Sequence, residues 1–262
     1  MNDPWHRLRQ FTQARIAQGR SGHAQTTAAQ LDFQLAHAAA RDAVHLPWDV
    51  GAFAQGAAAF GVKTIALETR ITDRVQYLKR PDLGRRLAPA SQAHLSKEEI
   101  NGADIALIFS NGLSSTAIDA HGLTLLGAIL DAYRNDPVGK TRRFAPVCLV
   151  PNARVALSDE LGALLKARLS VIVVGERPGL SAADSLGIYM TYNPNSANTD
   201  AERNCISNVR PPEGLSCEAA AAKLLYLGEQ AFQRRLSGVA LKDDMPGKLA
   251  LQGPVKIIGH EV

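Results

Sequence analysis

The polar residues that could bind a ligand or do chemistry gather in two short loops, and each loop directly follows a run of apolar residues. Residues 111–115 (NGLSS) follow the run DIALIFS, and residues 175–179 (GERPG) follow the run SVIVV. The first loop offers hydroxyl and amide groups, and the second offers the carboxylate of Glu176. An ionised carboxylate accepts strong, charge-assisted hydrogen bonds from N–H donors. We therefore expect a binding site at these two loops.

Common catalytic motifs are absent from the sequence. It has no G-x-G-x-x-G after a strand, no G-x-x-x-x-G-K-[ST], no G-x-S-x-G and no H-E-x-x-H. The cysteines Cys148, Cys205 and Cys217 share no C-x-x-C spacing, so they are interpreted as reduced thiols and not as a disulfide framework or a zinc site. We predict neither a catalytic constellation nor a metal site within this chain.

The elements that must position the two loops are short apolar strands that alternate with helices. Strands are predicted at residues 104–110, 146–150, 170–174 and 185–192, and helices at residues 115–133, 158–167 and 216–236. This pattern favours a mainly parallel sheet with helices on both faces. Such sheets bind ligands at the carboxyl ends of their strands. We predict a Rossmann-like α/β fold with an open sheet.

The chain divides into three predicted regions. Residues 1–100 are expected to be mostly helical, because residues 26–44 carry apolar side chains at helical spacing and end before Pro47. Within this region, residues 63–71 alternate enough to predict a strand. Residues 101–240 form the predicted Rossmann-like domain, and residues 241–262 a loosely held tail.

Composition excludes several classes of function. The net charge is +4, from 29 Lys and Arg against 25 Asp and Glu, and the charges are interspersed. This charge distribution lacks the clustered basic stripe that is typical of a nucleic-acid-binding protein. The apolar runs are far too short to span a bilayer, and the N-terminus lacks the apolar core of a signal peptide. We therefore predict a soluble, cytoplasmic protein without nucleic-acid or membrane partners.

Four segments together carry a resemblance to a known family. They are residues 77–87 (YLKRPDLGRRL), 110–114 (SNGLS), 174–180 (VGERPGL) and 203–208 (RNCISN). In this order and at these separations they resemble the light chain of ethanolamine ammonia-lyase, from about Trp5 to Gly238. One departure is visible: the loop expected as S-D-G-L-S carries Asn111, which removes a negative charge.

The resemblance implies a lyase that converts ethanolamine to acetaldehyde and ammonia in ethanolamine catabolism. Adenosylcobalamin supplies an adenosyl radical when its cobalt–carbon bond breaks. The heavy chain of the family is a barrel that holds substrate and radical, and the light chain closes the other side of the cofactor. The assembly is a hetero-oligomer of heavy–light pairs, and the light chain alone is not catalytic. Whether a bacterial microcompartment encloses it remains open.

The family also implies base-on binding, in which the cofactor's own benzimidazole keeps the lower cobalt position. Asp119-Ala120-His121-Gly122 is superficially similar to the D-x-H-x-x-G signature of proteins that bind cobalamin through a histidine. Position 124 is threonine, however, and the segment falls inside a predicted helix. His121 is therefore interpreted as a surface or interface residue.

In similar proteins, three light-chain residues contact the cofactor, and they correspond here to Val155, Glu176 and Cys205. Glu176 is suited to accept hydrogen bonds from the amide groups on the corrin rim. Backbone groups at Val155 and Cys205 are suited to pair with the amides or the nucleotide tail. Without the family, each has a structural interpretation: an ion pair of Glu176 with Arg177, core packing of Val155, and a buried, inert thiol at Cys205.

Two further features of the sequence each allow two interpretations. Lys79, Arg80, Arg85 and Arg86 bracket Asp82 and form either a solvated basic face or a surface for an acidic part of the heavy chain. Ser114 and Ser115 are expected to cap a helix, although a phosphate could also bind at such a helix start.

Two other classes of function compete with the subunit. One is a free-standing α/β module that binds or is regulated by a nucleotide-like ligand at the two loops. The other is a self-sufficient hydrolase, which the missing nucleophile–base motif disfavours.

Overall fold

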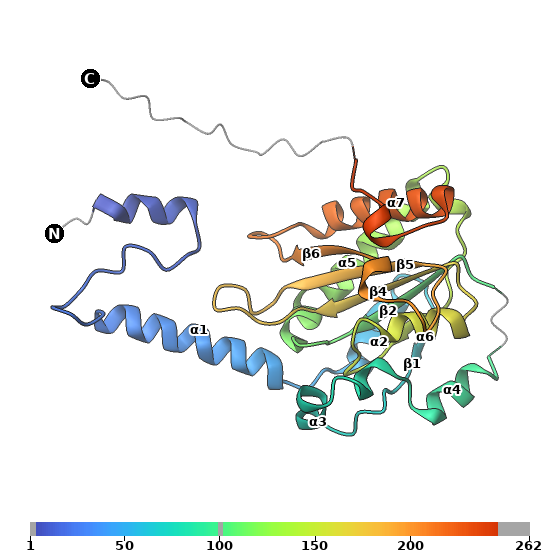
Figure 1. Ribbon diagram of the computed structural model, residues 1–262, viewed down its shortest axis with the longest axis horizontal. Coiled ribbons are helices and arrows are strands. Elements are labelled where there is room, and N and C mark those ends of the chain that lie inside the picture. Colours follow the sequence, from blue (N-terminus) through green and yellow to red (C-terminus); the bar gives the residue numbers. More distant parts are fainter. Residues whose placement is uncertain (1–3, 99–101, 246–262) are drawn as a thin grey trace, which may run out of the picture.

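A mixed sheet of six strands organises the chain, with the strand order β1-β3-β2-β4-β5-β6 (Figure 1). The computed structural model describes residues 4–98 and 102–245. The strands are β1 (Thr64–Ala66), β2 (Ile105–Ser110), β3 (Val147–Leu149), β4 (Leu169–Gly175), β5 (Leu186–Tyr192) and β6 (Arg203–Val209). The first four strands in the spatial order are parallel, whereas β5 is antiparallel to both β4 and β6. The α/β class is thus confirmed, and the sheet is partly antiparallel.

Burial explains which strands the sequence could predict. Every residue of β2 and β4 is buried, as expected for two strands that are apolar except for Ser110 and Ser170. The strand at the edge, β6, is polar and was not predicted. Ile206 and Val209 point into the core, while Cys205 and Ser207 are exposed on the other face. An edge strand of this kind is stabilised by its neighbour β5 more than by its own propensity.

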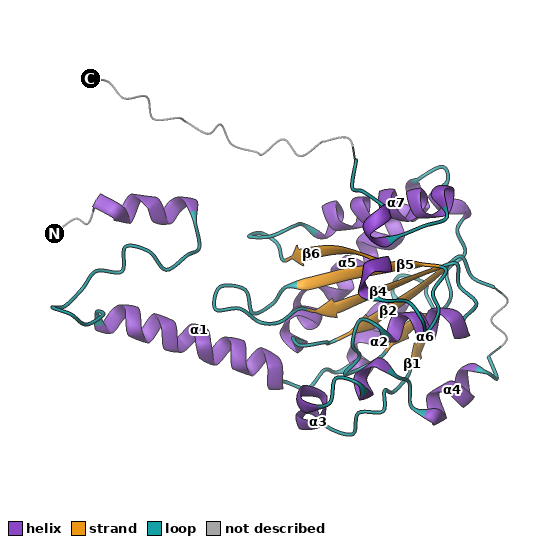
Figure 2. Ribbon diagram, viewed as in Figure 1, coloured by secondary structure: helices purple, strands orange, loops and turns teal. Residues whose placement is uncertain are grey.

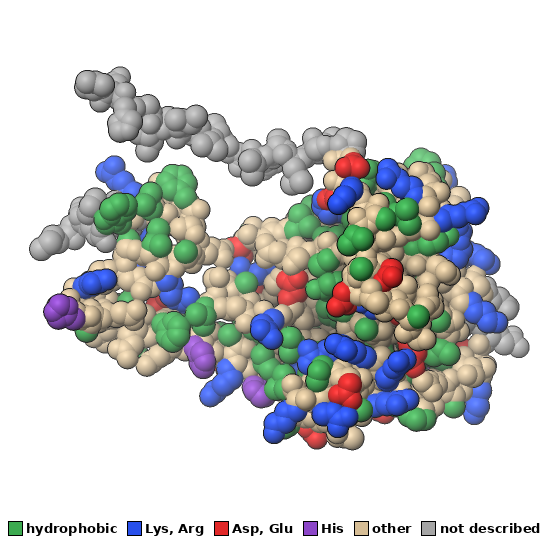
Figure 3. Space-filling model, in the orientation of Figure 1, with side chains coloured by type: hydrophobic (Ala, Val, Ile, Leu, Met, Phe, Trp, Pro, Cys, Tyr) green, Lys and Arg blue, Asp and Glu red, His purple; other side chains and the backbone are tan. Residues whose placement is uncertain are grey.

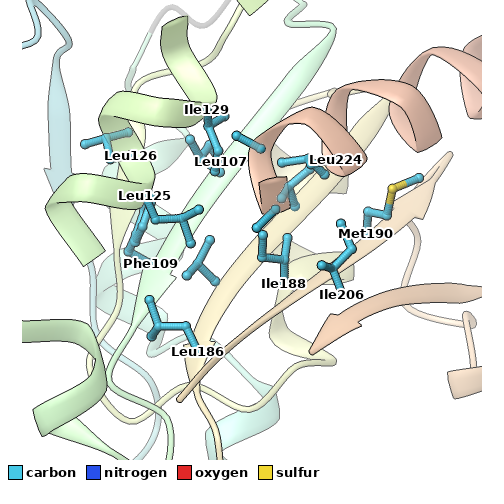
Figure 4. Packing of buried hydrophobic residues seen from close by; sticks show 14 of the residues in the cluster. Leu107, Phe109, Leu125, Leu126, Ile129, Leu186, Ile188, Met190, Ile206 and Leu224 are labelled. Carbon is cyan, nitrogen blue, oxygen red and sulfur yellow. The ribbon is translucent and has the colours of Figure 1, made fainter. Parts of the chain in front are cut away.

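Helices cover both faces of the sheet (Figure 2). On one face lie α2 (Val50–Ala58), α5 (Ser115–Asn135) and α7 (Cys217–Arg234), and their apolar side chains build the larger core (Figure 4). In that core Phe109 from β2 and Ile188 from β5 pack with Leu125 and Leu224 from the helices. On the other face, α4 (Pro89–Leu95) and α6 (Leu157–Leu164) pack against the smaller core. The predicted covering of both faces is confirmed.

The N-terminal region contains α1 (Thr27–His45) and α3 (Arg74–Lys79), and α1 projects away from the sheet (Figure 1). The side chain of Thr26 caps α1, and the helix stops before Pro47, as the sequence predicted. The strand predicted at residues 63–71 is limited to β1, which pairs with β3. Short 3-10 helices occur at Pro4–Phe11, Leu83–Arg85, Gly139–Thr141, Asp200–Glu202 and Gly238–Ala240.

Part of the predicted C-terminal tail, residues 246–262, lies outside the described residues. Among the residues that the structure describes, no helix is both long enough and apolar enough to cross a bilayer.

Candidate functional site

The two loops singled out by the sequence touch each other at the carboxyl ends of β2 and β4. The N–H of Leu113 donates to the carbonyl of Gly175 at 2.9 Å. Gly112 has a φ of +48°, and a Cβ there would lie 2.5 Å from the Gly175 oxygen. Glycine is needed at this position because the backbones approach too closely for a side chain. The predicted location of the two loops is therefore confirmed.

Two adjoining hollows lie beside these loops, on the sheet face that carries α6, and we call them together the groove. One has a volume of about 460 Å³ and is lined by Glu176, and the other has about 580 Å³ and is lined by Cys205. Arg154, Val155 and Tyr189 line both hollows. All three residues that the resemblance marked thus lie along one groove, although the sequence separates them by up to fifty positions.

The carboxylate of Glu176 is held from three sides. Ser185 Oγ donates to its Oε2 at 2.6 Å, Ser207 Oγ donates to its Oε1 at 2.5 Å, and the Asn208 N–H donates to Oε2 at 3.3 Å. The structural alternative, an ion pair with Arg177 or another surface base, is wrong, since Glu176 takes part in no ion pair of the described residues and its carboxylate accepts only from hydroxyl and backbone donors. The carboxylate is thus fixed by donors from β6 and from the start of β5.

Cys205 and Tyr189 are paired across β6 and β5 and line the groove together. Cys205 is exposed, so its interpretation as a buried thiol is wrong. Partial burial nevertheless raises the pKa of the Cys205 thiol. Partial burial, followed by the neighbouring Cys205, also raises the pKa of the Tyr189 phenol. Both groups are therefore neutral at pH 7 and present uncharged hydrogen-bonding atoms to the groove.

Val155 lies in the turn before α6 and is half-buried against the smaller core. Its carbonyl accepts from the N–H of Ser158 at 3.1 Å and from Ser158 Oγ at 2.9 Å. Its own N–H has no hydrogen-bond partner within the described part of the chain. Val155 therefore combines the packing role that its type suggests with a backbone donor that is available to a ligand.

Sequence reasoning missed a stack of side chains beside the groove. The guanidinium carbons of Arg154 and Arg74 lie 4.1 and 4.6 Å from the centre of the Tyr77 ring. Tyr77 is buried, and burial raises the pKa of its phenol, which donates to the Ala153 carbonyl at 3.2 Å. The sequence marked Arg154 only as the neighbour of Val155 and Tyr77 only as the first residue of the segment YLKRPDLGRRL, and nothing in it showed that these two residues, 77 positions apart, are in contact.

The side chain of Asn111 is buried within the first loop and does not line the groove. Its Oδ1 accepts from the Asn152 N–H at 2.8 Å, and its Nδ2 donates to Ser115 Oγ at 3.1 Å. Ser115 Oγ in turn donates to the Leu46 carbonyl at 2.6 Å. The departure from the family pattern therefore serves an internal hydrogen-bond network in which an amide supplies both an acceptor and a donor.

Ser114 caps α5, because its Oγ accepts from the Ala117 N–H at 3.1 Å. The same hydroxyl donates to the Ala183 carbonyl at 2.7 Å. Both Ser114 and Ser115 are fully buried. The start of α5 is thus occupied by protein atoms, and a phosphate at this point is excluded.

His121, interpreted from the sequence as a surface or interface residue, is half-buried in this chain. Its Nε2 lies 3.3 Å from Asp184 Oδ2, and Asp184 also pairs with Arg210. Burial opposes ionisation of Asp184, but its hydrogen bond and ion pair with Arg210 outweigh burial and lower its pKa. His121 lines neither hollow of the groove and belongs to this structural network.

The four basic residues that the sequence set apart are all exposed. Arg80 forms two hydrogen bonds to Asp82, and Arg86 lies 3.8 Å from Glu160. Arg85 lines the hollow that contains Cys205. Lys and Arg side chains gather around α3 on the face shown in Figure 3. The basic surface therefore borders the groove.

Together these features define an α/β protein with a groove at the strand ends, lined by both polar and apolar residues, and with no cluster of potential metal ligands among residues 4–98 and 102–245. The chain matches the family model described as "Ethanolamine ammonia-lyase light chain (EutC)" over residues 2–242 and belongs to this family. The resemblance noted in the sequence is confirmed.

Curated relatives support the same family. The chain is 51% identical to the ethanolamine ammonia-lyase small subunit of Azotobacter vinelandii over 245 residues, which cover 92% of this chain and 89% of the relative. It is 50% identical to that of Ralstonia nicotianae, with 92% and 88% covered. It is 48% identical to that of Pseudomonas aeruginosa strain UCBPP-PA14, with 98% and 93% covered.

Proposed function

We propose that this chain is the light subunit of an ethanolamine ammonia-lyase and holds adenosylcobalamin against a catalytic heavy chain. The complex would convert ethanolamine to acetaldehyde and ammonia. The observation that carries the proposal is the fixed carboxylate of Glu176, in one groove with Val155 and Cys205. These three residues are proposed to contact the cofactor, and none of them is proposed to be catalytic.

The groove residues fit the chemistry of the cofactor. The corrin rim carries amide groups, whose N–H donors match the carboxylate of Glu176 and whose carbonyls match the free N–H of Val155. Cys205 and Tyr189 add neutral partners on the floor of the groove. When bound, adenosylcobalamin supplies an adenosyl radical by homolysis of its cobalt–carbon bond. The chain's own residues bind and orient the cofactor.

Base-on binding is part of the same proposal. The described residues that line the groove include no histidine, and His121 is engaged with Asp184 elsewhere. This part of the chain therefore offers no imidazole to a cobalt in the groove. The parallel half of the sheet, β1-β3-β2-β4, supports the Rossmann-like description of the part that carries the groove.

The heavy chain is proposed to be a barrel subunit, and heavy–light pairs are proposed to assemble into a hetero-oligomer in the cytoplasm, with or without a microcompartment shell. The basic surface of Lys79, Arg80, Arg85 and Arg86 borders the groove, so a heavy chain that covers the cofactor would approach this surface. Positive charge there suits an acidic region of the partner.

Co-expression with the heavy chain tests the proposal. The purified complex is expected to release acetaldehyde from ethanolamine only when adenosylcobalamin is added, and the light chain alone is expected to release none. Activity of the isolated light chain would overturn the division of labour. A light chain that does not co-purify with the heavy chain, and binds a free nucleotide instead, would favour the free-standing module.

A further inference from the structure

We propose that Arg154 is a phosphate-binding residue of the groove, and that with adenosylcobalamin bound it holds the phosphodiester of the nucleotide tail. The inference rests on the proposed function for the identity of the ligand, but the anion site itself follows from this chain's own residues. Arg154 lies at the junction of the two hollows, between the half that contains Glu176 and the half that contains Cys205.

The first observation is that the charge of Arg154 lacks a counter-ion. Its Nη2 donates to the Tyr77 carbonyl at 2.9 Å, and its Nε is buried without a hydrogen-bond partner. None of the ion pairs of the described residues includes Arg154. An arginine side chain has five N–H donors and stays charged, so most of this donor capacity is available.

The charges of the other half-buried arginines of the described chain have carboxylate partners, except for that of Arg74. Ion pairs with Asp or Glu are formed by Arg15, Arg142, Arg203 and Arg210. Arg74 has no carboxylate but donates to the carbonyls of Val44 and Gly112 and to Asn152 Oδ1. Arg203 also lines the groove and has an unpaired Nε, but its charge is neutralised by Asp159 and Asp200, whereas Arg154 forms no ion pair within the described residues. A buried donor without a partner costs free energy that a ligand can recover.

The second observation is that the side chain is held ready. The guanidinium of Arg154 lies over the Tyr77 ring, and the backbone N–H of Arg154 donates to the Gly84 carbonyl at 2.8 Å. A Cβ at position 84 would come within 3.0 Å of Arg154 Cγ, so glycine leaves room for the stem. Tyr77 and Gly84 both belong to the segment YLKRPDLGRRL, so two residues of this segment hold Arg154 in place.

The charges along the groove favour an anion, because four arginines line it against two acids, Glu176 and Asp200. Arg85 lines the same hollow and is exposed, which adds a second positive charge. The acid in that hollow, Asp200, is paired with Arg203. The planar fork of a guanidinium matches two oxygens of a phosphate, whereas an amide carbonyl offers only one. A phosphate group is therefore the ligand chemistry that fits Arg154.

The test compares two ligands on the heavy–light complex. Cobalamin carries the nucleotide tail with its phosphate, and cobinamide has the same corrin without either. We expect Arg154→Met to weaken adenosylcobalamin binding by about 10- to 100-fold, because a charge-assisted contact is lost. Cobinamide affinity is expected to stay within about 3-fold of wild type, and Arg154→Lys is expected to lie between the two because it keeps the charge but not the fork.

Arg234→Met is the matched control, since Arg234 is exposed on α7 and lines neither hollow, and it should leave both affinities nearly unchanged. Equal loss of cobalamin and cobinamide binding in Arg154→Met would overturn the inference, as would no loss. Thermal unfolding and co-purification show whether the variant is folded. If Arg154→Met fails to assemble, the same comparison is made with Arg154→Lys.

The outcomes separate this inference from the proposed function. A wild-type complex that binds no cobalamin would refute the proposed function and not the anion site. The site is then tested with inorganic phosphate alone on the full-length chain. Saturable binding that Arg154→Met abolishes would support it, and identical behaviour of wild type and variant would overturn it.

Discussion

Replacing Glu176 with glutamine tests the candidate site most directly. The substitution keeps the shape of the side chain but turns one carboxylate oxygen into an NH2 donor. Ser185, Ser207 and the N–H of Asn208 all donate to the carboxylate. The serine hydroxyls can rotate and accept instead, so a glutamine that keeps its oxygen at the Oε2 position retains the bond from Asn208.

The expected effect on binding follows from the loss of charge. Hydrogen bonds to a charged group contribute about 1.5–3 kcal/mol, and neutral ones contribute about 1 kcal/mol. A single contact between Glu176 and a corrin amide therefore predicts an adenosylcobalamin affinity about 3- to 30-fold weaker in Glu176→Gln. The weaker bonds from β5 and β6 should also lower the melting temperature by about 2–4 °C, which corresponds to ~1 kcal/mol in a chain of this size.

The assay is a titration of the heavy–light complex with adenosylcobalamin, with thermal unfolding of the same samples. Ser207→Ala is the control, because it loosens the carboxylate without removing its charge. Glu176→Gln should therefore weaken binding more than Ser207→Ala at a similar loss of stability. Unchanged affinity in Glu176→Gln, or equal effects of both variants, would refute a direct contact and leave Glu176 only a structural role.

Three further substitutions test the ion pair, the hydrogen bonds and the close backbone contact described above. Because the pKa of Asp184 is lowered, its ion pair with Arg210 stabilises the fold above the ordinary pKa of 3.8, and this contribution is lost as the pH falls below that value. Asp184→Asn should therefore be less stable than wild type at pH 7 and should lose less stability on acidification. Urea unfolding at a series of pH values measures both effects. Asn111→Asp should leave cofactor affinity unchanged and cost about 1 kcal/mol, because the amide donor is lost inside the protein; a marked change in affinity would contradict its buried position. Gly112→Ala should cost about 3 kcal/mol or more, since the new Cβ would meet the Gly175 carbonyl at a positive φ, and a melting temperature equal to wild type would disprove the close approach.

Much of the sheet was predictable because its central strands β2, β3 and β4 consist almost entirely of apolar residues. The runs at β2, β3 and β4 have no other plausible place than a sheet covered on both sides. The direction of β5 was also accessible in principle. Residues 176–185 are the whole connection from β4, which is short for the crossover that a parallel neighbour needs. The length of this link, and not the composition of the strand, was the informative signal.

The sequence by itself determined the family, the two loops at the strand ends and the residues that the family motifs carry. Only the tertiary structure decided how these residues act. It brought Ser207 and Asn208 from β6 onto the carboxylate of Glu176. It also placed Arg154 against Tyr77, seventy-seven positions earlier in the chain. Motifs record local sequence, whereas the partners of a half-buried charge are chosen by strand pairing and loop packing between distant segments. That is why the fixed carboxylate and the unpaired guanidinium became visible only in the folded chain.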